Sequence, residues 1–163
     1  MHGRIFQLNC SGGGVPKLPV REARLSATGL DCDKQTHTRF HGGVERALCL
    51  YAVERIRELQ AEGHPISAGS TGENVTLENL DWARLELGSR LKIGDEVVIE
   101  IASYTVPCKQ IRESFVGGNF KRIDQKLRPG WARLYARVLQ MGVLRVNQRV
   151  ELINDAENAG SGA

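Results

Sequence analysis

The sequence predicts one domain that is mainly β with a few helices (α+β), arranged as a barrel or a sandwich. Short apolar or alternating segments follow one another closely along the chain, which is typical of antiparallel sheets that close or stack. Few segments have the apolar spacing of a helix. The chain has 163 residues, an ordinary length for a single domain with a substantial core. No internal repeat or linker divides it.

The strands expected in the first half of the chain are residues 3–9, 20–25 and 48–51. The third leads directly into a helix, whose apolar face includes Val53, Ile56 and Leu59. Residues 63–65, which contain a glycine and a proline, should end that helix, because glycine favours the C-cap conformation and proline cannot continue a helix.

The strands expected in the second half are residues 90–93, 96–104, 131–141 and 149–153. Gly94 and Asp95 between the first two are a suitable two-residue hairpin turn. Residues 108–127 should be partly helical, with a break at two consecutive glycines. Residues 154–163 are small and polar, so we expect a domain over residues 1–153 and a disordered tail.

Composition narrows the class of protein. No apolar stretch approaches the roughly 20 residues that span a bilayer, and the first residues lack the apolar segment of a secretory signal. The four cysteines show neither CxxC spacing nor a zinc-type pairing with histidine. We therefore expect a cytoplasmic protein without membrane association, whose cysteines are reduced thiols.

The net charge of +3 is unevenly distributed. Residues 1–103 carry 12 basic and 14 acidic side chains, whereas residues 104–153 carry 10 basic and 3 acidic ones. A basic block of this kind suits nucleic acid, a small phosphorylated ligand or simply a solvated surface. Its aromatic residues do not match an RNA-binding signature, so we expect no nucleic-acid partner.

Cys108 is the residue with the most informative setting. It follows the alternating segment 97–104 and Pro107, a residue that suits the first turn of a helix. Unpaired backbone N–H groups at such a junction, together with Lys109 and Arg112, would favour the thiolate, which attacks electrophiles or binds a soft metal. The alternative is a small, buried and inert cysteine.

Two further stretches are candidate ligand loops. Residues 10–17 are rich in glycine and end at Lys17, so backbone N–H groups and an ammonium could surround an anion. The spacing differs from that of a nucleotide P-loop, which makes ATP an unsuitable ligand. Residues 69–76 place Glu73 and Asn74 directly after a glycine-containing turn, where they could offer hydrogen bonds to a planar heterocycle. Flexible turns are the alternative for both stretches.

Residues 35–47 form a third candidate loop, with two histidines, two arginines and a Gly-Gly pair. His37 and His41 have the i, i+4 spacing of a helical metal pair. The neighbouring glycines argue against a zinc site of the HExxH type, and so does the absence of a glutamate directly after the first histidine.

Taken in order, these stretches resemble the MOSC family, named after the C-terminal domain of molybdenum cofactor sulfurases. The resemblance covers roughly residues 4–153, and its strength lies in the order and spacing of the pieces. The matching pieces are Lys17 with Pro19-Val20, Gly29–Asp31, His41–Gly43 with Arg46-Ala47, Gly72–Asn74, Pro107-Cys108, and Gly130-Trp131 with Arg137-Val138. It implies a MOSC-type β-barrel with a pocket for the molybdopterin form of the molybdenum cofactor.

The resemblance also implies roles for individual residues. Cys108 would be the catalytic residue and the thiolate ligand of molybdenum. The candidates for the pterin phosphate and the oxo groups are Lys17, Arg39, Arg46 and Arg137. The residues that would orient the cofactor in its pocket are His41, Glu73 and Asn74.

Two functions remain open on the sequence. The first is a molybdenum-dependent reductase of small N-hydroxylated compounds, with electrons from a separate electron-transfer protein, since the sequence shows no flavin or iron–sulfur motif. The second is a carrier that delivers the cofactor, or a persulfide sulfur on Cys108, to other proteins. The sequence favours the reductase modestly, because it resembles the whole pocket and not only the reactive thiol.

Overall fold

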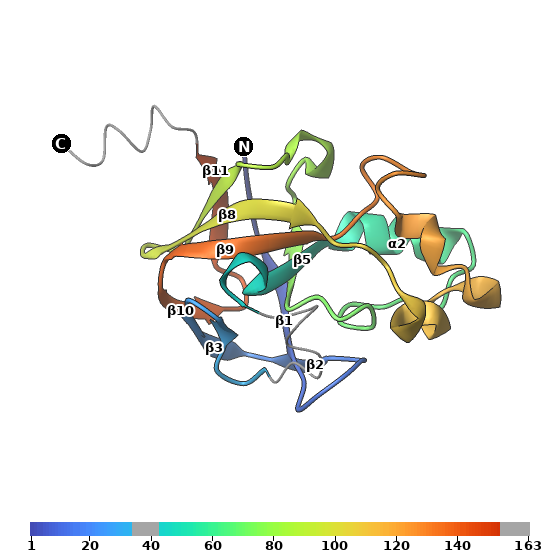
Figure 1. Cartoon of the computed structure of the whole chain (residues 1–163). Coiled ribbons are helices and arrows are strands. Elements are labelled where there is room, and N and C mark those ends of the chain that lie inside the picture. Colours follow the sequence, from blue (N-terminus) through green and yellow to red (C-terminus); the bar gives the residue numbers. More distant parts are fainter. Residues whose placement is uncertain (34–42, 154–163) are drawn as a thin grey trace.

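A computed structural model describes residues 1–33 and 43–153. Its centre is a closed barrel of seven strands, in which pairing of the first and last strands completes the ring (Figure 1). In order around the barrel these are β11 (Arg149–Ile153), β7 (Arg90–Ile93), β8 (Val97–Tyr104), β9 (Leu134–Gln140), β5 (Leu48–Ala52), β6 (Val75–Glu78) and β1 (His2–Cys10). All neighbours are antiparallel except β5 and β6, which are parallel. The expected β-barrel is thus confirmed.

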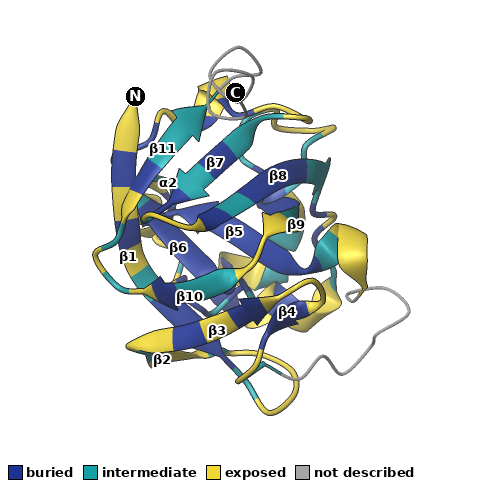
Figure 2. Ribbon diagram, turned by 90° about the vertical axis from the view of Figure 1, so that its left-hand side faces the viewer, coloured by how far each residue is buried: buried dark blue, intermediate teal, exposed yellow. Residues whose placement is uncertain are grey.

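Smaller elements surround the barrel. Strand β2 (Leu18–Val20) extends the sheet beyond β1, and a separate sheet contains β10 (Gly142–Arg145), β3 (Glu22–Ser26) and β4 (Gly29–Leu30) (Figure 2). Helix α2 (Val53–Ala61) directly follows β5. The short 3-10 helices are η1 (Val44–Arg46), η2 (Trp82–Arg84), η3 (Lys109–Ser114), η4 (Val116–Gly118) and η5 (Phe120–Ile123). Within the described residues, no helix is long and apolar enough to cross a membrane.

The core fills the barrel and the space beneath α2. Strands β3 and β7 alternate between more and less buried residues, as strands with one face on a core do. Strand β5 is buried along its whole length, because the barrel covers one face and neighbouring elements cover the other. Val53, Ile56 and Leu59 of α2 are buried, which confirms the apolar face expected for this helix.

Most expected elements are present, with corrected boundaries. The strand expected at 149–153 matches β11 to the residue, and the strand expected at 96–104 matches β8 except for its first residue. The hairpin turn after β7 has three residues rather than two, since β8 begins at Val97. The strand expected at 20–25 is divided at Arg21 between β2 and β3, which belong to different sheets.

The strand expected at 131–141 is shorter than predicted, because the Trp131 N–H donates to the Arg128 carbonyl and closes a turn before β9. The region 108–127 contains three short 3-10 helices, η3 to η5, and Gly117 has a positive φ of 63° where the break was expected. Residues 154–163, expected to be disordered, lie outside the described residues.

Candidate functional site

Cys108 lies four residues beyond the end of β8 and immediately before η3. This confirms the expected junction between a strand and a helix. The helix is a single 3-10 segment of six residues, and Pro107 precedes it rather than lying in its first turn. Cys108 itself is half-buried in an extended conformation, while the neighbouring Lys109 and Arg112 are exposed.

The four cysteines are in three different states. Cys10 and Cys32 form a disulfide, with their Cα atoms 5.7 Å apart, which corrects the expectation that all thiols are reduced. Their separation of 22 residues gave no spacing signal, and the fold brings the end of β1 beside the loop after β4. Cys49 is free but buried, and burial raises the pKa of its thiol. All four lie in the described part of the chain, so Cys108 is its only solvent-accessible free thiol.

Tyr135 on β9 connects the two free thiols electrostatically. The pKa of Tyr135 is raised to about 12, mainly by burial and also by the charges of Cys49 and Cys108. The guanidinium groups of Arg133 and Arg46 lower this pKa, and the Arg46 group lies 5.4 Å from the ring centroid. Two free thiols and two guanidinium groups thus act electrostatically on one aromatic ring near the start of β9.

Glu73 is completely buried and belongs to a second polar group. Its carboxylate accepts hydrogen bonds from the Gly69 N–H and, at 2.8 Å, from the Thr71 hydroxyl. Arg133, which is also buried, donates through Nη1 to the Thr71 carbonyl. Burial raises the pKa of Glu73 to about 7, although the Thr71 hydrogen bond and the positive charge of Arg133 oppose this effect.

Asp33 is the centre of a third polar group. Its carboxylate accepts from the Lys17 ammonium at 2.6 Å, from the Asn74 amide at 2.9 Å and from the Ser11 N–H at 3.0 Å. The side-chain oxygen Oδ1 of Asn74 in turn accepts from the Cys49 N–H at 3.0 Å. Lys17 and Asn74, predicted from separate loops, are therefore brought together on one carboxylate.

The glycine at position 69 permits this arrangement. Gly69 has a φ of 87°, and its carbonyl accepts from the Lys17 N–H at 2.9 Å. A Cβ at this position would overlap the Lys17 carbonyl oxygen. The two predicted ligand loops, residues 10–17 and 69–76, therefore pack directly against each other.

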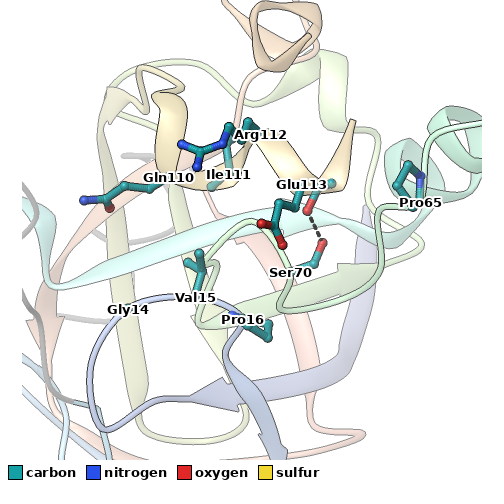
Figure 3. A pocket seen from close by; sticks show the side chains of 10 residues that line it. Gly14, Val15, Pro16, Pro65, Ser70, Gln110, Ile111, Arg112 and Glu113 are labelled. Carbon is teal, nitrogen blue, oxygen red and sulfur yellow. Dashed lines mark hydrogen bonds between the residues drawn. The ribbon is translucent and has the colours of Figure 1, made fainter. Parts of the chain in front are cut away.

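A cavity of about 460 Å³ lies between the glycine-rich loop and η3 (Figure 3). Val15 and Pro16 form one wall, and residues 110–114, which begin two positions after Cys108, form another. The hydroxyl group of Ser70, in the loop of residues 69–76, is 2.8 Å from that of Ser114 and joins this loop to η3. Figure 3 shows Ser70 facing the cavity beside Glu113. The cavity could hold a small polar molecule.

The basic residues predicted to bind the cofactor differ in whether a carboxylate already binds them. The Arg137 guanidinium binds the Glu100 carboxylate and lies 3.3 Å from that of Glu45, and these partners raise its pKa. Arg46 has an aromatic face beneath it instead. Arg39 and His41, as well as His37 of the rejected zinc pair, lie outside the described residues.

Asp33, Thr71 and Arg133 belong to the site, although sequence reasoning did not select them. Arg133 lay within the basic block, but no pattern distinguished it from the exposed cations there. Its burial and the lack of a hydrogen-bond partner for its Nε within the described structure became visible only in the fold. Asp33 could have been suspected from its position next to a cysteine, which was a weak signal.

Comparison with known proteins identifies the family. The profile of the MOSC domain matches residues 37–151. Protein YiiM of Escherichia coli (strain K12) is 28% identical over 138 residues, covering 82% of this chain and 60% of the relative. The uncharacterized protein YflK of Bacillus subtilis (strain 168) is 26% identical, covering 88% and 65% respectively. This chain thus spans less than two thirds of either relative.

One fungal relative and two solved structures add to this comparison. A protein of Gibberella moniliformis named "Reductase" is 28% identical, covering 78% of this chain but only 23% of that protein. The crystal structure of the YUAD protein from B. subtilis has a TM-score of 0.73 at 18% identity, over 93% of this chain and 96% of that one. YiiM from Geobacillus stearothermophilus has a TM-score of 0.71 at 21% identity, over 93% and 75%. The profile match covers most of the sequence, and the chain belongs to the MOSC domain family.

Proposed function

We propose that this protein binds the molybdenum cofactor through Cys108 and reduces small N-hydroxylated compounds, using electrons from a separate protein. MOSC domains are associated with the molybdenum cofactor. The observation that carries the proposal is the state of the cysteines: among all four, Cys108 alone is both free and accessible to solvent. A thiolate is a suitable ligand for a soft metal centre.

The surrounding residues fit an anionic cofactor. Arg46 lies over the Tyr135 ring, the Lys17 ammonium lies against the Asp33 carboxylate, and the buried Arg133 has an N–H group without a partner in the described structure. A buried unpaired donor is costly, so a ligand oxygen at that position would lower the free energy of the site. Glu73, whose two oxygens are already bonded, would act by holding the 69–76 loop.

The proposed reaction needs both electrons and protons. Converting an N–OH group to N–H consumes two electrons and two protons and releases water. Molybdenum would supply the redox chemistry, and the partner protein would supply the electrons. The relative named "Reductase" supports this direction. The cavity beside η3 is lined by polar side chains, Arg112, Glu113 and Gln110, as well as by apolar ones such as Val15 and Ile111; the polar ones would contact the N-hydroxyl group of a small substrate.

Metal analysis tests the proposed ligand. The protein would be purified from a host that makes molybdopterin, and molybdenum and pterin would be measured per chain. We expect Cys108→Ala to lose stoichiometric molybdenum while its circular dichroism is unchanged. Cys49→Ser is the matched control, because Cys49 is the other free cysteine but is buried. Equal molybdenum in the wild type and Cys108→Ala would refute the proposal.

The accessibility of Cys108 also suits a carrier of the cofactor or of persulfide sulfur. Single-turnover assays separate the two functions. A reductase that is loaded with molybdenum and reduced by viologen should convert an amidoxime or a hydroxylamino base to the amidine or amine. A carrier should give no product, but should transfer cofactor or radiolabelled sulfur to an acceptor protein. Failure with several N-hydroxylated substrates would favour the carrier.

A further inference from the structure

The carboxylate of Asp33 occupies a position that is built for an anion. Three donors converge on it: the Lys17 ammonium, the Asn74 amide and the backbone N–H of Ser11. The Asp33 side chain is only 4% exposed, and that of Lys17 is 11% exposed. An ammonium, an amide and a backbone N–H together can equally hold the oxygens of a phosphate group. Asp33 therefore acts as an internal counter-ion in this donor set.

The disulfide holds this counter-ion in place. Cys32 directly precedes Asp33, and Cys10 directly precedes Ser11, so the bond fixes the carboxylate beside the donors at the end of β1. A covalent tether raises the effective concentration of a group at its binding site, and hence its ability to compete with a free ligand. Cys32 is exposed, so a reductant from solution can reach the bond.

We propose that the Ser11 N–H, the Lys17 ammonium and the Asn74 amide form a binding site for a phosphate-type oxyanion, and that the Cys10–Cys32 disulfide closes it by holding Asp33 there. A dithiol reductant opens the site. It donates two electrons and two protons to the S–S bond, which yields two thiols, and is itself oxidised to a disulfide. Asp33 then loses its tether, and a phosphate oxygen can replace it.

This inference rests on the proposed function only for the natural ligand, which would be the phosphate of the cofactor. The predicted switch itself needs neither molybdenum nor Cys108. If Cys108 binds no molybdenum, the proposed function fails, but the redox dependence of phosphate binding can still be measured. If the affinity for phosphate does not depend on the disulfide, the proposed switch is wrong, but the result on molybdenum binding is unaffected.

Inorganic phosphate is the probe for the experiment. Its affinity would be measured by isothermal titration calorimetry, with the oxidised protein and with protein reduced by dithiothreitol and kept reduced. We expect reduction to tighten binding by about tenfold or more, the scale of one charge-assisted hydrogen bond. Lys17→Ala should remove this gain. Equal affinity in the two redox states would overturn the proposal.

Two variants identify the groups responsible. Cys32→Ser cannot form the disulfide, so it should bind phosphate like the reduced wild type and should not respond to dithiothreitol. A response in this variant would assign the effect to another thiol and overturn the proposal. Asp33→Asn removes the competing charge while leaving the disulfide intact. It should bind phosphate tightly even when oxidised, and weak binding there would show that Asp33 is not the competitor.

Discussion

Glu73 and Arg133, two buried groups of opposite charge, are joined through a single residue. Thr71 donates its hydroxyl hydrogen to the Glu73 carboxylate, and its carbonyl accepts from Arg133 Nη1. The loop that contains Glu73 is thereby fixed to the residue just before β9. Because the pKa of Glu73 is raised to about 7, this connection contains a carboxyl group that titrates near neutral pH.

The stability of the protein should therefore depend on Glu73 between about pH 4.5 and pH 7. The folded protein holds this proton more tightly than the unfolded chain, whose carboxyl has its ordinary value of 4.5. Stability from this group is thus complete below pH 4.5 and is lost as pH rises through 7. At about 1.4 kcal/mol per pKa unit, the loss should be about 3 kcal/mol.

Urea unfolding at several pH values would check this prediction. Glu73→Gln cannot titrate, so its free energy of unfolding should depend less on pH across the same interval. The slope is the readout, because the substitution also changes the hydrogen bonds to Gly69 and Thr71. Parallel pH profiles for the wild type and the variant would contradict the raised pKa.

Thiol titration should show three classes of cysteine. The native, non-reduced protein should react with a water-soluble disulfide reagent at one thiol, Cys108, because Cys49 is buried. Unfolding without a reductant should expose a second thiol, and reduction should bring the total to four. Cys108→Ala should leave no thiol that reacts in the native state. Two fast-reacting thiols in the native wild type would contradict this assignment.

The fold could be predicted to the extent that local pattern determines it. Strand β11 was located to the residue and β8 to within one residue, because the apolar residues in both have the spacing of a half-buried strand. Strand β10 was missed, because its four residues gain their partners from β3, more than a hundred residues away. Ring closure depends on the pairing of β1 with β11, which local pattern does not specify.

Those residues of the candidate site that belong to a sequence motif could be predicted. Lys17, Asn74 and Cys108 came from three distant stretches. The structure joins the first two through Asp33, and Asn74 also accepts from the Cys49 N–H. Cys108 shares with Cys49 only an electrostatic effect on Tyr135. Arg133 could not be selected, because its role depends on burial in the folded protein. The disulfide was also missed, since sequence separation does not report the distance between Cα atoms.

The disulfide should contribute measurably to stability. It closes a loop of 22 residues, and restriction of the unfolded chain by a loop of this length is worth about 3 kcal/mol. Cys32→Ser is the milder substitution, because Cys32 is exposed whereas Cys10 packs in the core. Its free energy of unfolding in denaturant should fall by about that amount. Dithiothreitol should lower the wild type to the same level but should not affect the variant.

Cofactor anchoring should depend more on Arg46 than on Arg137. The Arg137 guanidinium already binds the Glu100 carboxylate and lies near that of Glu45, so transferring it to a phosphate would first break these contacts. Arg46 lies over the ring of Tyr135, near the start of β9, and can bind a phosphate with less rearrangement. A charge-assisted hydrogen bond is worth about 1.5–3 kcal/mol, so Arg46→Ala should weaken pterin retention by about tenfold or more.

Gel filtration of the loaded proteins, with pterin measured in the protein peak, would compare Arg46→Ala with Arg137→Ala. The second variant is the matched control, since it removes the same charge from the neighbouring strand. We expect it to retain most of the pterin and to lose some stability, because Glu100 loses one of its two arginine partners. If Arg46→Ala retains pterin as the wild type does, while remaining folded, Arg46 does not anchor the cofactor. Loss in the Arg137 variant alone would transfer that role to Arg137 and would require its carboxylate partners to separate from it when the cofactor binds.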